Sequence, residues 1–165
     1  MIVELLIFAF VVASDLVSKA LLAPFLQETG SYVIIDKIFT FIYSENTGAS
    51  FGIFAGNKFL LIGLTCVVCV LLAAFLLWQR KSPKFFRISL ILILGGAIGN
   101  LYDRIFLGYV RDFIDYTFLD TFFGIDFAIG NIADIYLCVG VLMMIVYVIF
   151  VFKEDDFTFI KKKSK

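Results

Sequence analysis

The chain contains no histidine, carries no net charge and has only three cysteines among its 165 residues. Without histidine, Ser-His-Asp and Cys-His nucleophile schemes are excluded, and so is the commonest zinc ligand. A net charge of zero gives no electrostatic footprint for nucleic acid. The cysteines lie in apolar runs, where free cysteine packs as a small hydrophobic residue: Cys66, Cys69 and Cys138. We expect neither a metal nor a cofactor.

Apolar residues, in contrast, are in excess. Hydrophobic residues make up 62% of the chain, aromatic residues 18%, and the mean hydropathy is +1.02. Soluble domains are nearer half apolar, so this composition predicts an integral membrane protein, and the length predicts one domain over residues 1–165. The first residues lack the basic region of a cleavable signal peptide, and we expect none. Four stretches are long enough to cross a core of ~30 Å as helices: 2–23, which we expect Pro24 to end, 59–79, 88–107 and 131–152.

Basic residues are distributed unevenly over the segments between these stretches. The loop 80–87 and the tail 153–165 hold Arg80, Lys81, Lys84, Arg87, Lys153, Lys161, Lys162, Lys163 and Lys165. The loops 24–58 and 108–130 hold only Lys37, Lys58 and Arg111. The positive-inside rule therefore predicts that 80–87 is an inner loop, that the tail is cytoplasmic and that both termini are inside. In the first outer loop, β-branched and aromatic residues at 32–35 and 38–43 predict two short strands.

Polar side chains interrupt three of the four stretches, although a charge in hydrocarbon costs roughly 2.5–3.5 kcal/mol at mid-membrane. A rise of about 1.5 Å per residue puts Asp15 and Asn100 roughly 18–20 Å above the inner surface. The fourth stretch descends from outside and carries its polar residues in its first turn. All of them reach the outer leaflet, and most have the i,i+3 or i,i+4 spacing of one helix face: Asp15 and Lys19; Asn100, Asp103 and Arg104; Asn131 and Asp134.

Carboxylates gathered at one depth can hydrolyse a peptide without histidine or metal. Repulsion keeps two neighbouring carboxylates from ionising together, so that one donates a proton while the other accepts one from water. The helix dipole favours an anion at Asp134, which lies in the first turn of its helix. Asp112, in the loop 108–130, and Asp103 are both candidates for the second carboxylate, and the residues alone do not separate them.

Plainer interpretations apply to the same residues. In these interpretations, Asp15 and Lys19 form only an intrahelical ion pair, and Asp103 and Arg104 only anchor the chain at the membrane interface. Residues 46–48 are then an ordinary turn. A proton-coupled transporter would also use intramembrane acids, but the inner halves of the four stretches are nearly free of polar groups. A catalytically silent assembly protein of the same fold is a third alternative, which only an activity assay separates from an enzyme.

Five motifs occur in the order of a known family. They are D-L-V-S-K (15–19), N-T-G-A-S-F (46–51), G-G-A-I-G-N-L-Y-D-R (95–104), V-R-D-F (110–113) and N-I-A-D (131–134). Together, and over essentially the whole chain, they resemble lipoprotein signal peptidase, the type II signal peptidase of bacteria. Each motif is weak alone, but all five in order are highly specific.

The resemblance implies an all-α membrane fold of four transmembrane helices, with a small extracytoplasmic β-cradle and a short extracytoplasmic helical loop. It implies an aspartyl endopeptidase of the bacterial cytoplasmic membrane, monomeric and with its active site near the outer leaflet. Its partners would be membrane lipid and diacylglyceryl-modified prolipoproteins, which it would cut just before the lipidated cysteine. The catalytic pair falls on Asp112 and Asp134, and supporting roles fall on Asp15, Lys19, Asn46, Gly48, Asn100, Asp103, Arg104, Asn131 and Ala133.

The chain departs from the family pattern in two places. Gly130 precedes Asn131, where the family usually has phenylalanine, and the loop between Asp112 and Asp134 is a few residues longer than usual. Both departures bear on loop shape and substrate fit more than on catalysis.

Overall fold

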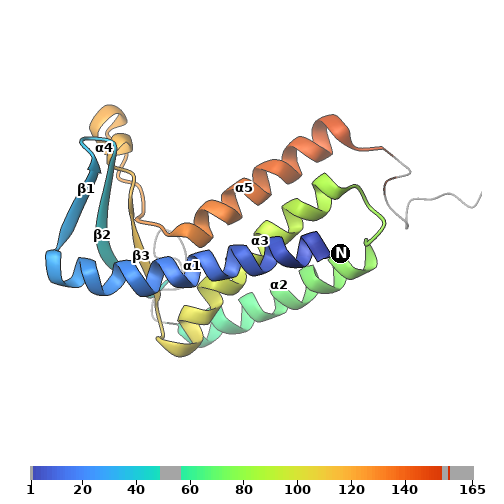
Figure 1. Cartoon of the computed structure of the whole chain (residues 1–165), viewed down its shortest axis with the longest axis horizontal. Coiled ribbons are helices and arrows are strands. Elements are labelled where there is room, and N and C mark those ends of the chain that lie inside the picture. Colours follow the sequence, from blue (N-terminus) through green and yellow to red (C-terminus); the bar gives the residue numbers. More distant parts are fainter. Residues whose placement is uncertain (1, 49–56, 154–155, 157–165) are drawn as a thin grey trace, which may run out of the picture.

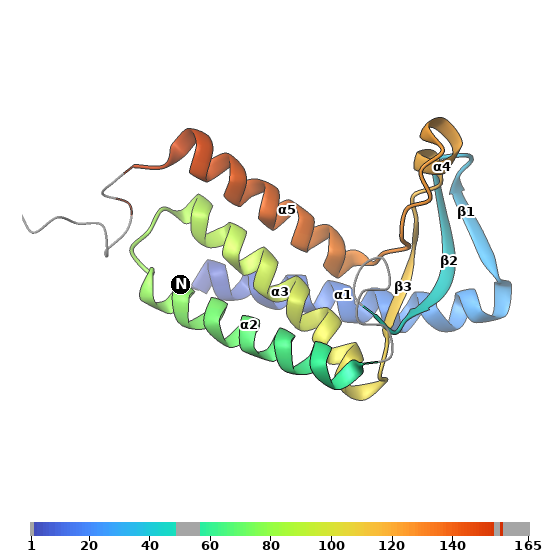
Figure 2. The ribbon, with the colours of Figure 1, turned by 180° about the vertical axis from the view of Figure 1, so that it is seen from behind.

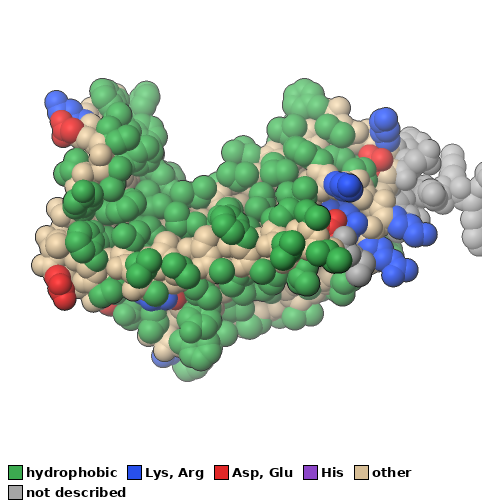
Figure 3. All heavy atoms as spheres, in the orientation of Figure 1, with side chains coloured by type: hydrophobic (Ala, Val, Ile, Leu, Met, Phe, Trp, Pro, Cys, Tyr) green, Lys and Arg blue, Asp and Glu red, His purple; other side chains and the backbone are tan. Residues whose placement is uncertain are grey.

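Four long helices lie alongside one another, and a small sheet stands at one end of them (Figure 1). The computed structural model describes residues 2–48, 57–153 and 156. The helices are α1 (Ile2–Thr29), α2 (Lys58–Trp78), α3 (Lys84–Phe106) and α5 (Ile132–Val146), which the π-helical turn η2 (Tyr147–Val151) continues. All four are long and apolar enough to cross a membrane, and their outer surfaces are largely apolar (Figure 3). The predicted fold of four membrane helices is confirmed.

The central helix is α3, which contacts α1, α2 and α5 (Figure 2). Half of its most apolar window is buried, against 11% for α2. Glycine permits these close approaches, because a Cβ atom on Gly95 would fall on the side chain of Val11 in α1. At the opposite interface, a Cβ atom on Gly140 of α5 would meet Ile93 of α3. Small residues thus set the helix spacing, as expected of membrane helices that lack a hydrophobic driving force between them.

The sheet consists of β1 (Ser31–Ile35), β2 (Phe39–Asn46) and β3 (Val110–Asp115) in the antiparallel order β1-β2-β3. The strands predicted at 32–35 and 38–43 correspond closely to β1 and β2, whereas β3 was not predicted. Leu26 of α1 packs under the sheet against Phe113 and Ile114. The short helix α4 (Thr117–Phe123) follows β3 and supplies the expected helical segment in the loop 108–130.

Two helix boundaries differ from the prediction. Helix α1 continues through Pro24 to Thr29 instead of ending there. A proline removes one helical N–H bond, but Leu26, only 1% exposed, holds the following turn under the sheet. Helix α3 begins at Lys84, four residues earlier than predicted, because Phe86 packs in a buried cluster with Leu90 and Tyr147.

One predicted motif and the predicted basic tail include residues that the structure does not describe. The last three residues of the 46–51 motif lie outside the described residues. So do residues 157–165 of the tail, which hold four of its five basic side chains.

Candidate active site

Strand β3 and the beginning of α5 are joined through Gly130. The backbone N–H groups of Phe113 and Ile114 donate to the carbonyl oxygen of Gly130 at 2.8 and 2.7 Å, and the Gly130 N–H donates back to Ile114 at 2.9 Å. Because Asp112 precedes Phe113 and Asn131 follows Gly130, this bridge brings the V-R-D-F and N-I-A-D motifs side by side.

Asn131 caps α5, and its partner in the cap is Asp134. The Asn131 side-chain oxygen accepts from the Asp134 N–H at 3.1 Å, and Asp134 Oδ2 accepts from the Asn131 N–H at 3.0 Å. Such a reciprocal capping box satisfies two N–H groups that a helix beginning would leave unpaired. It also fixes the carboxylate of Asp134 at the positive end of the helix dipole.

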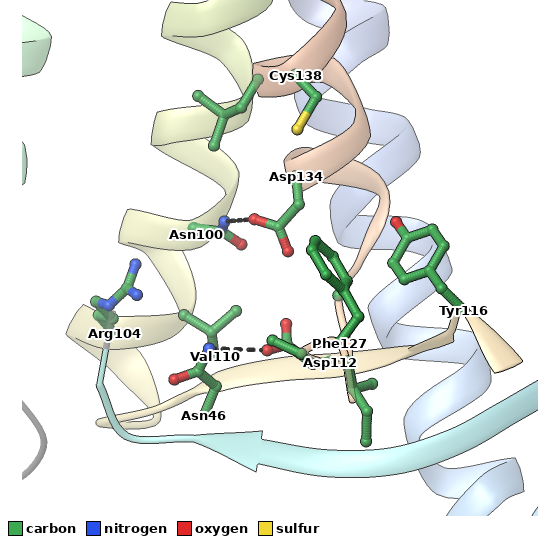
Figure 4. Close-up of a pocket in the computed structure, with 13 residues that line it drawn as sticks. Asn46, Asn100, Arg104, Val110, Asp112, Tyr116, Phe127, Asp134 and Cys138 are labelled. Carbon is green, nitrogen blue, oxygen red and sulfur yellow. Dashed lines mark hydrogen bonds between the residues drawn. The ribbon is translucent and has the colours of Figure 1, made fainter. Parts of the chain in front are cut away.

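Two side-chain amides, those of Asn131 and Asn100, link Asp134 to Asp112. Figure 4 shows the hydrogen bond from Asn100 to Asp134 and the one from Asn46 to Asp112. The Asn131 Nδ2 group donates to Asp112 Oδ1 at 2.5 Å and to Asn100 Oδ1 at 3.0 Å. The Asn100 Nδ2 group donates to Asp134 Oδ1 at 2.8 Å. From the other side, Asn46 Nδ2 donates to Asp112 Oδ2 at 3.0 Å. Both carboxylates are therefore held by donors from different segments of the chain.

Asp15 and Lys19 form a fully buried pair behind these amides. Lys19 Nζ lies 2.8 Å from Asp15 Oδ2 and donates to Asn100 Oδ1, also at 2.8 Å. Asp15 Oδ1 accepts from the backbone N–H of Ala133 at 2.9 Å. A Cβ atom on Gly99 would fall on Asp15 Oδ2, so the pair requires glycine there. Asp15 and Lys19 are thus more than an intrahelical ion pair, since they connect α1 to both α3 and α5.

Asp103 is bound by cations on both sides. Arg111 NH2 lies 2.7 Å from Asp103 Oδ1, and the Arg111 Nε and backbone N–H groups donate to Oδ2 at 3.1 and 3.0 Å. Lys19 Nζ lies 3.8 Å from the same Oδ2. Asp103 is 0% exposed and does not line the cavity described below. Asp103 is therefore not an interfacial anchor that keeps its charge in water.

Arg104 holds the turn that carries Asn46. Its NH2 group donates to the carbonyl oxygen of Gly48 at 2.9 Å, and the Gly48 N–H donates to Asn46 Oδ1 at 3.0 Å. Asn46 in turn contacts Asp112. The turn predicted at 46–48 is therefore part of the hydrogen-bonded cluster.

A cavity of about 220 Å³ lies where these segments meet. Its polar lining comprises Asn46, Asn100, Arg104, Asp112 and Asp134, all of them site residues predicted from the sequence. The buried residues Asp15, Lys19, Asp103, Asn131 and Ala133 lie behind it. Gly48 is also buried and reaches the cavity only through its contacts with Asn46 and Arg104.

The cavity has further lining residues, mostly apolar, that the sequence analysis missed. Tyr116, Phe127, Leu137 and Cys138 all contribute to it. Leu137 and Cys138 could have been predicted, because they follow Asp134 at i+3 and i+4 and residues with this spacing share one helix face. Tyr116 has no such local signal, because its position depends on β3. Its ring packs edge-to-face on Phe127, with centroids 5.6 Å apart.

The surroundings of Asp112 alter the protonation of its carboxyl group. Burial, followed by the charge of Asp134, raises the pKa of Asp112 to about 6, although hydrogen bonds from Asn46 and Asn131 oppose the rise. Burial, followed by the charge of Asp134, also raises the pKa of the Tyr116 hydroxyl. Among the described residues, no group of three or more Cys, Asp or Glu side chains is arranged to hold a metal ion.

Nearly the whole chain is similar in sequence to known proteins. The family model described as "Signal peptidase (SPase) II" matches residues 7–150. The lipoprotein signal peptidase of Clostridium tetani is 38% identical over 154 residues, 93% of this chain and 95% of that protein. The lipoprotein signal peptidase of Caldanaerobacter subterraneus is 39% identical over 140 residues, which are 85% of this chain and 91% of that protein.

Two solved bacterial membrane enzymes have the same fold. The first has a TM-score of 0.80 at 31% sequence identity, and the match covers 92% of this chain and 96% of that chain. The second has a TM-score of 0.78 at 32% sequence identity, and the match covers 90% of this chain and 88% of that chain. With the four membrane helices, these likenesses identify a multi-pass membrane peptidase. The chain belongs to the signal peptidase II family, the lipoprotein signal peptidases.

Proposed function

We propose that this protein is an aspartyl endopeptidase that removes signal peptides from diacylglyceryl-modified prolipoproteins, cutting before the lipidated cysteine. Membership of the lipoprotein signal peptidase family supports the processing of prolipoproteins. The observation that carries the aspartyl mechanism is the amide-linked pair of Asp112 and Asp134 on one cavity.

In this mechanism Asp112 begins with a proton and Asp134 begins as a carboxylate. Asp134 accepts a proton from water, and the water oxygen bonds to the scissile carbonyl carbon while Asp112 donates its proton to the carbonyl oxygen. The tetrahedral intermediate then expels the amine of the lipidated cysteine, which takes the proton held by Asp134. The hydroxyl of the intermediate returns its proton to Asp112 as the carboxylic acid product forms. The raised pKa of Asp112 and the position of Asp134 at a helix N-terminus support these roles.

Asp103 is the rival for the second catalytic carboxylate, and its contacts argue against that role. Both of its oxygens accept from Arg111, and Lys19 lies beside them. With both oxygens bound to Arg111 and its side chain outside the cavity lining, Asp103 is not placed to donate a proton to a substrate there. Asp103, Asp15 and Lys19 instead support the site by fixing Asn100 and the strand that carries Asp112.

The remaining supporting residues shape the cavity around the substrate. Asn46, Gly48 and Arg104 hold the turn against α3, and Asn131 and Ala133 begin the helix that carries Asp134. Among the described residues, the Tyr116 hydroxyl has no hydrogen-bond partner although it lines the cavity. We assign it a hydrogen bond to the backbone of the substrate.

The substrate lipid agrees with a site at the boundary of the bilayer. Two acyl chains tether a prolipoprotein by about 0.8 kcal/mol per buried CH₂ group, so its cleavage point stays near the headgroups. We propose a single domain over residues 1–165, monomeric, with both termini cytoplasmic and the sheet and site on the outer side. The basic residues at 80–87 support this orientation.

The test is cleavage of a diacylglyceryl prolipoprotein by the purified full chain in detergent. Asp112→Asn and Asp134→Asn should each lower turnover by roughly 10²–10⁴-fold, the usual contribution of a general acid or base. Asp36→Asn is the matched control, because Asp36 is exposed in the turn between β1 and β2 and should keep full activity. Normal turnover in either site variant contradicts the mechanism.

A further inference from the structure

A second cavity lies far from the proposed active site, between α1, α2 and α3 at the end of the bundle away from the sheet. Its volume is about 580 Å³. The wall is almost entirely apolar and includes Leu5, Phe8, Leu76, Leu77 and Ile91. Among the residues that the structure describes, the charged ones that line it are Glu4, Arg80 and Arg87. We call it the basal groove.

The two arginines at the mouth of the basal groove are incompletely paired within the described part of the chain. Arg87 NH2 pairs with Glu4, and Arg87 NH1 donates to the carbonyl oxygen of Arg80. The Arg87 Nε atom is buried and has no hydrogen-bond partner among the described residues. The Arg80 side chain is exposed and likewise has no partner within the described part of the chain. The exposed Arg80 guanidinium therefore presents free N–H groups beside an apolar wall, and the half-buried Arg87 adds a second positive charge there.

The charge around this mouth is positive. Among the described lining residues one acid faces two arginines, and Lys81 and Lys84 follow in the same short loop and first helical turn. Figure 3 shows Lys and Arg side chains gathered at this end of the molecule. Guanidinium groups bind phosphate with two parallel hydrogen bonds, and basic pockets between membrane helices suit anionic headgroups.

The depth of the basal groove suits an extended hydrocarbon chain. From Arg87 to Leu94, which both line it, α3 rises about 10 Å along its axis. A chain that begins at the arginines can therefore continue between the helices toward the middle of the bundle. A ligand with a phosphate at one end and an acyl chain at the other matches both parts of the cavity.

We propose that the basal groove binds one anionic phospholipid, with its phosphate on Arg80 and Arg87 and one acyl chain between α1, α2 and α3. The binding is independent of the peptidase activity. The net positive charge of the mouth selects a headgroup with net negative charge over a zwitterionic one. The lipid would also fill a cavity between three helices and so stabilise their packing.

The experiment uses the purified full chain in a neutral detergent. Native mass spectrometry measures the binding of phosphatidylglycerol and of phosphatidylcholine with identical acyl chains. We expect phosphatidylglycerol to bind about tenfold more tightly, the equivalent of one charge-assisted hydrogen bond, and to raise the thermal unfolding temperature. Equal binding of the two lipids overturns the proposal.

Two pairs of variants separate the basal groove from general attraction to the basic surface. Arg80→Gln should weaken phosphatidylglycerol binding about tenfold, whereas Lys81→Gln removes the same charge from a residue outside the lining and should have little effect. Ala73→Phe should block the acyl chain, because Ala73 lines the groove, whereas its neighbour Ala74 is exposed and Ala74→Phe should bind normally. Equal losses within either pair, or no loss in Arg80→Gln and Ala73→Phe, contradict the site.

Discussion

The side-chain amide of Asn131 donates a hydrogen bond to the carboxylate of Asp112, which lies 19 residues earlier in the chain. The same amide nitrogen donates to Asn100, whose own amide donates to Asp134. The two carboxylates are thus connected through neutral donors rather than through a cation. Neutral donors hold the geometry of a pair that must share one proton, whereas a cation would favour the doubly ionised state.

Asp112 and Asp103 should respond in opposite ways to the same substitution. In Asp112→Asn, a buried carboxyl group close to Asp134 is replaced by a neutral amide of the same size, so activity should be lost while the unfolding temperature stays equal or rises. In Asp103→Asn, Lys19 and Arg111 lose their common anion, which should cost about 3–5 kcal/mol of folding free energy. Cleavage and thermal unfolding of both variants check this contrast. A stable, inactive Asp103→Asn protein beside an active Asp112→Asn protein would reverse the assignment.

The pH dependence of cleavage should follow the pKa of Asp112. Because Asp112 must carry a proton and its pKa is raised to about 6, kcat/KM should fall as pH rises above about 6. The Asn46 hydrogen bond favours the carboxylate and lowers this pKa, so Asn46→Ala should move the fall to higher pH. Thr47→Ala, at the exposed neighbouring position, should leave it unchanged. A shift to lower pH in Asn46→Ala would contradict the role of Asp112 as acid.

The hydroxyl of Tyr116 should contribute to turnover without contributing to folding. Tyr116→Phe keeps the ring contacts with Phe39 and Phe127. It should lower kcat/KM about three- to tenfold, as expected for one neutral hydrogen bond, at an unchanged unfolding temperature. Tyr32→Phe, in the exposed strand β1, is the control. Wild-type kcat/KM in Tyr116→Phe would exclude the hydroxyl from substrate binding.

Glycine at position 99 should be essential for helix packing. Gly99→Ala would put a methyl group on the Asp15 carboxylate and should cost about 1–3 kcal/mol through overpacking. Gly63→Ala in α2 adds the same atom to open space and should be neutral or stabilising by about 0.5–1 kcal/mol. Thermal unfolding of the two variants in one detergent measures the difference. Equal stability would show that α1 and α3 are not packed as closely as described.

The sequence predicts the local features of this molecule better than those that depend on distant segments. The four helices follow from apolar length, because lipid leaves the backbone few alternatives. The buried pair of Asp15 and Lys19 is visible because charges in apolar stretches are costly. Strand β3 contains three charged residues and depends on pairing with β2 and Gly130, so no local pattern reveals it. Arg111 was counted only as a basic loop residue, since its contact with Asp103 arises when β3 folds back onto α3.

The most direct measurement compares single-turnover cleavage rates of a diacylglyceryl prolipoprotein by four proteins: the wild type, Asp112→Asn, Asp134→Asn and the double variant. Residues that act as a unit are strongly non-additive. We predict that each single variant loses nearly all activity and that the double variant is no slower than either. A single variant that cleaves at the wild-type rate, or losses that multiply in the double variant, would contradict a shared-proton pair.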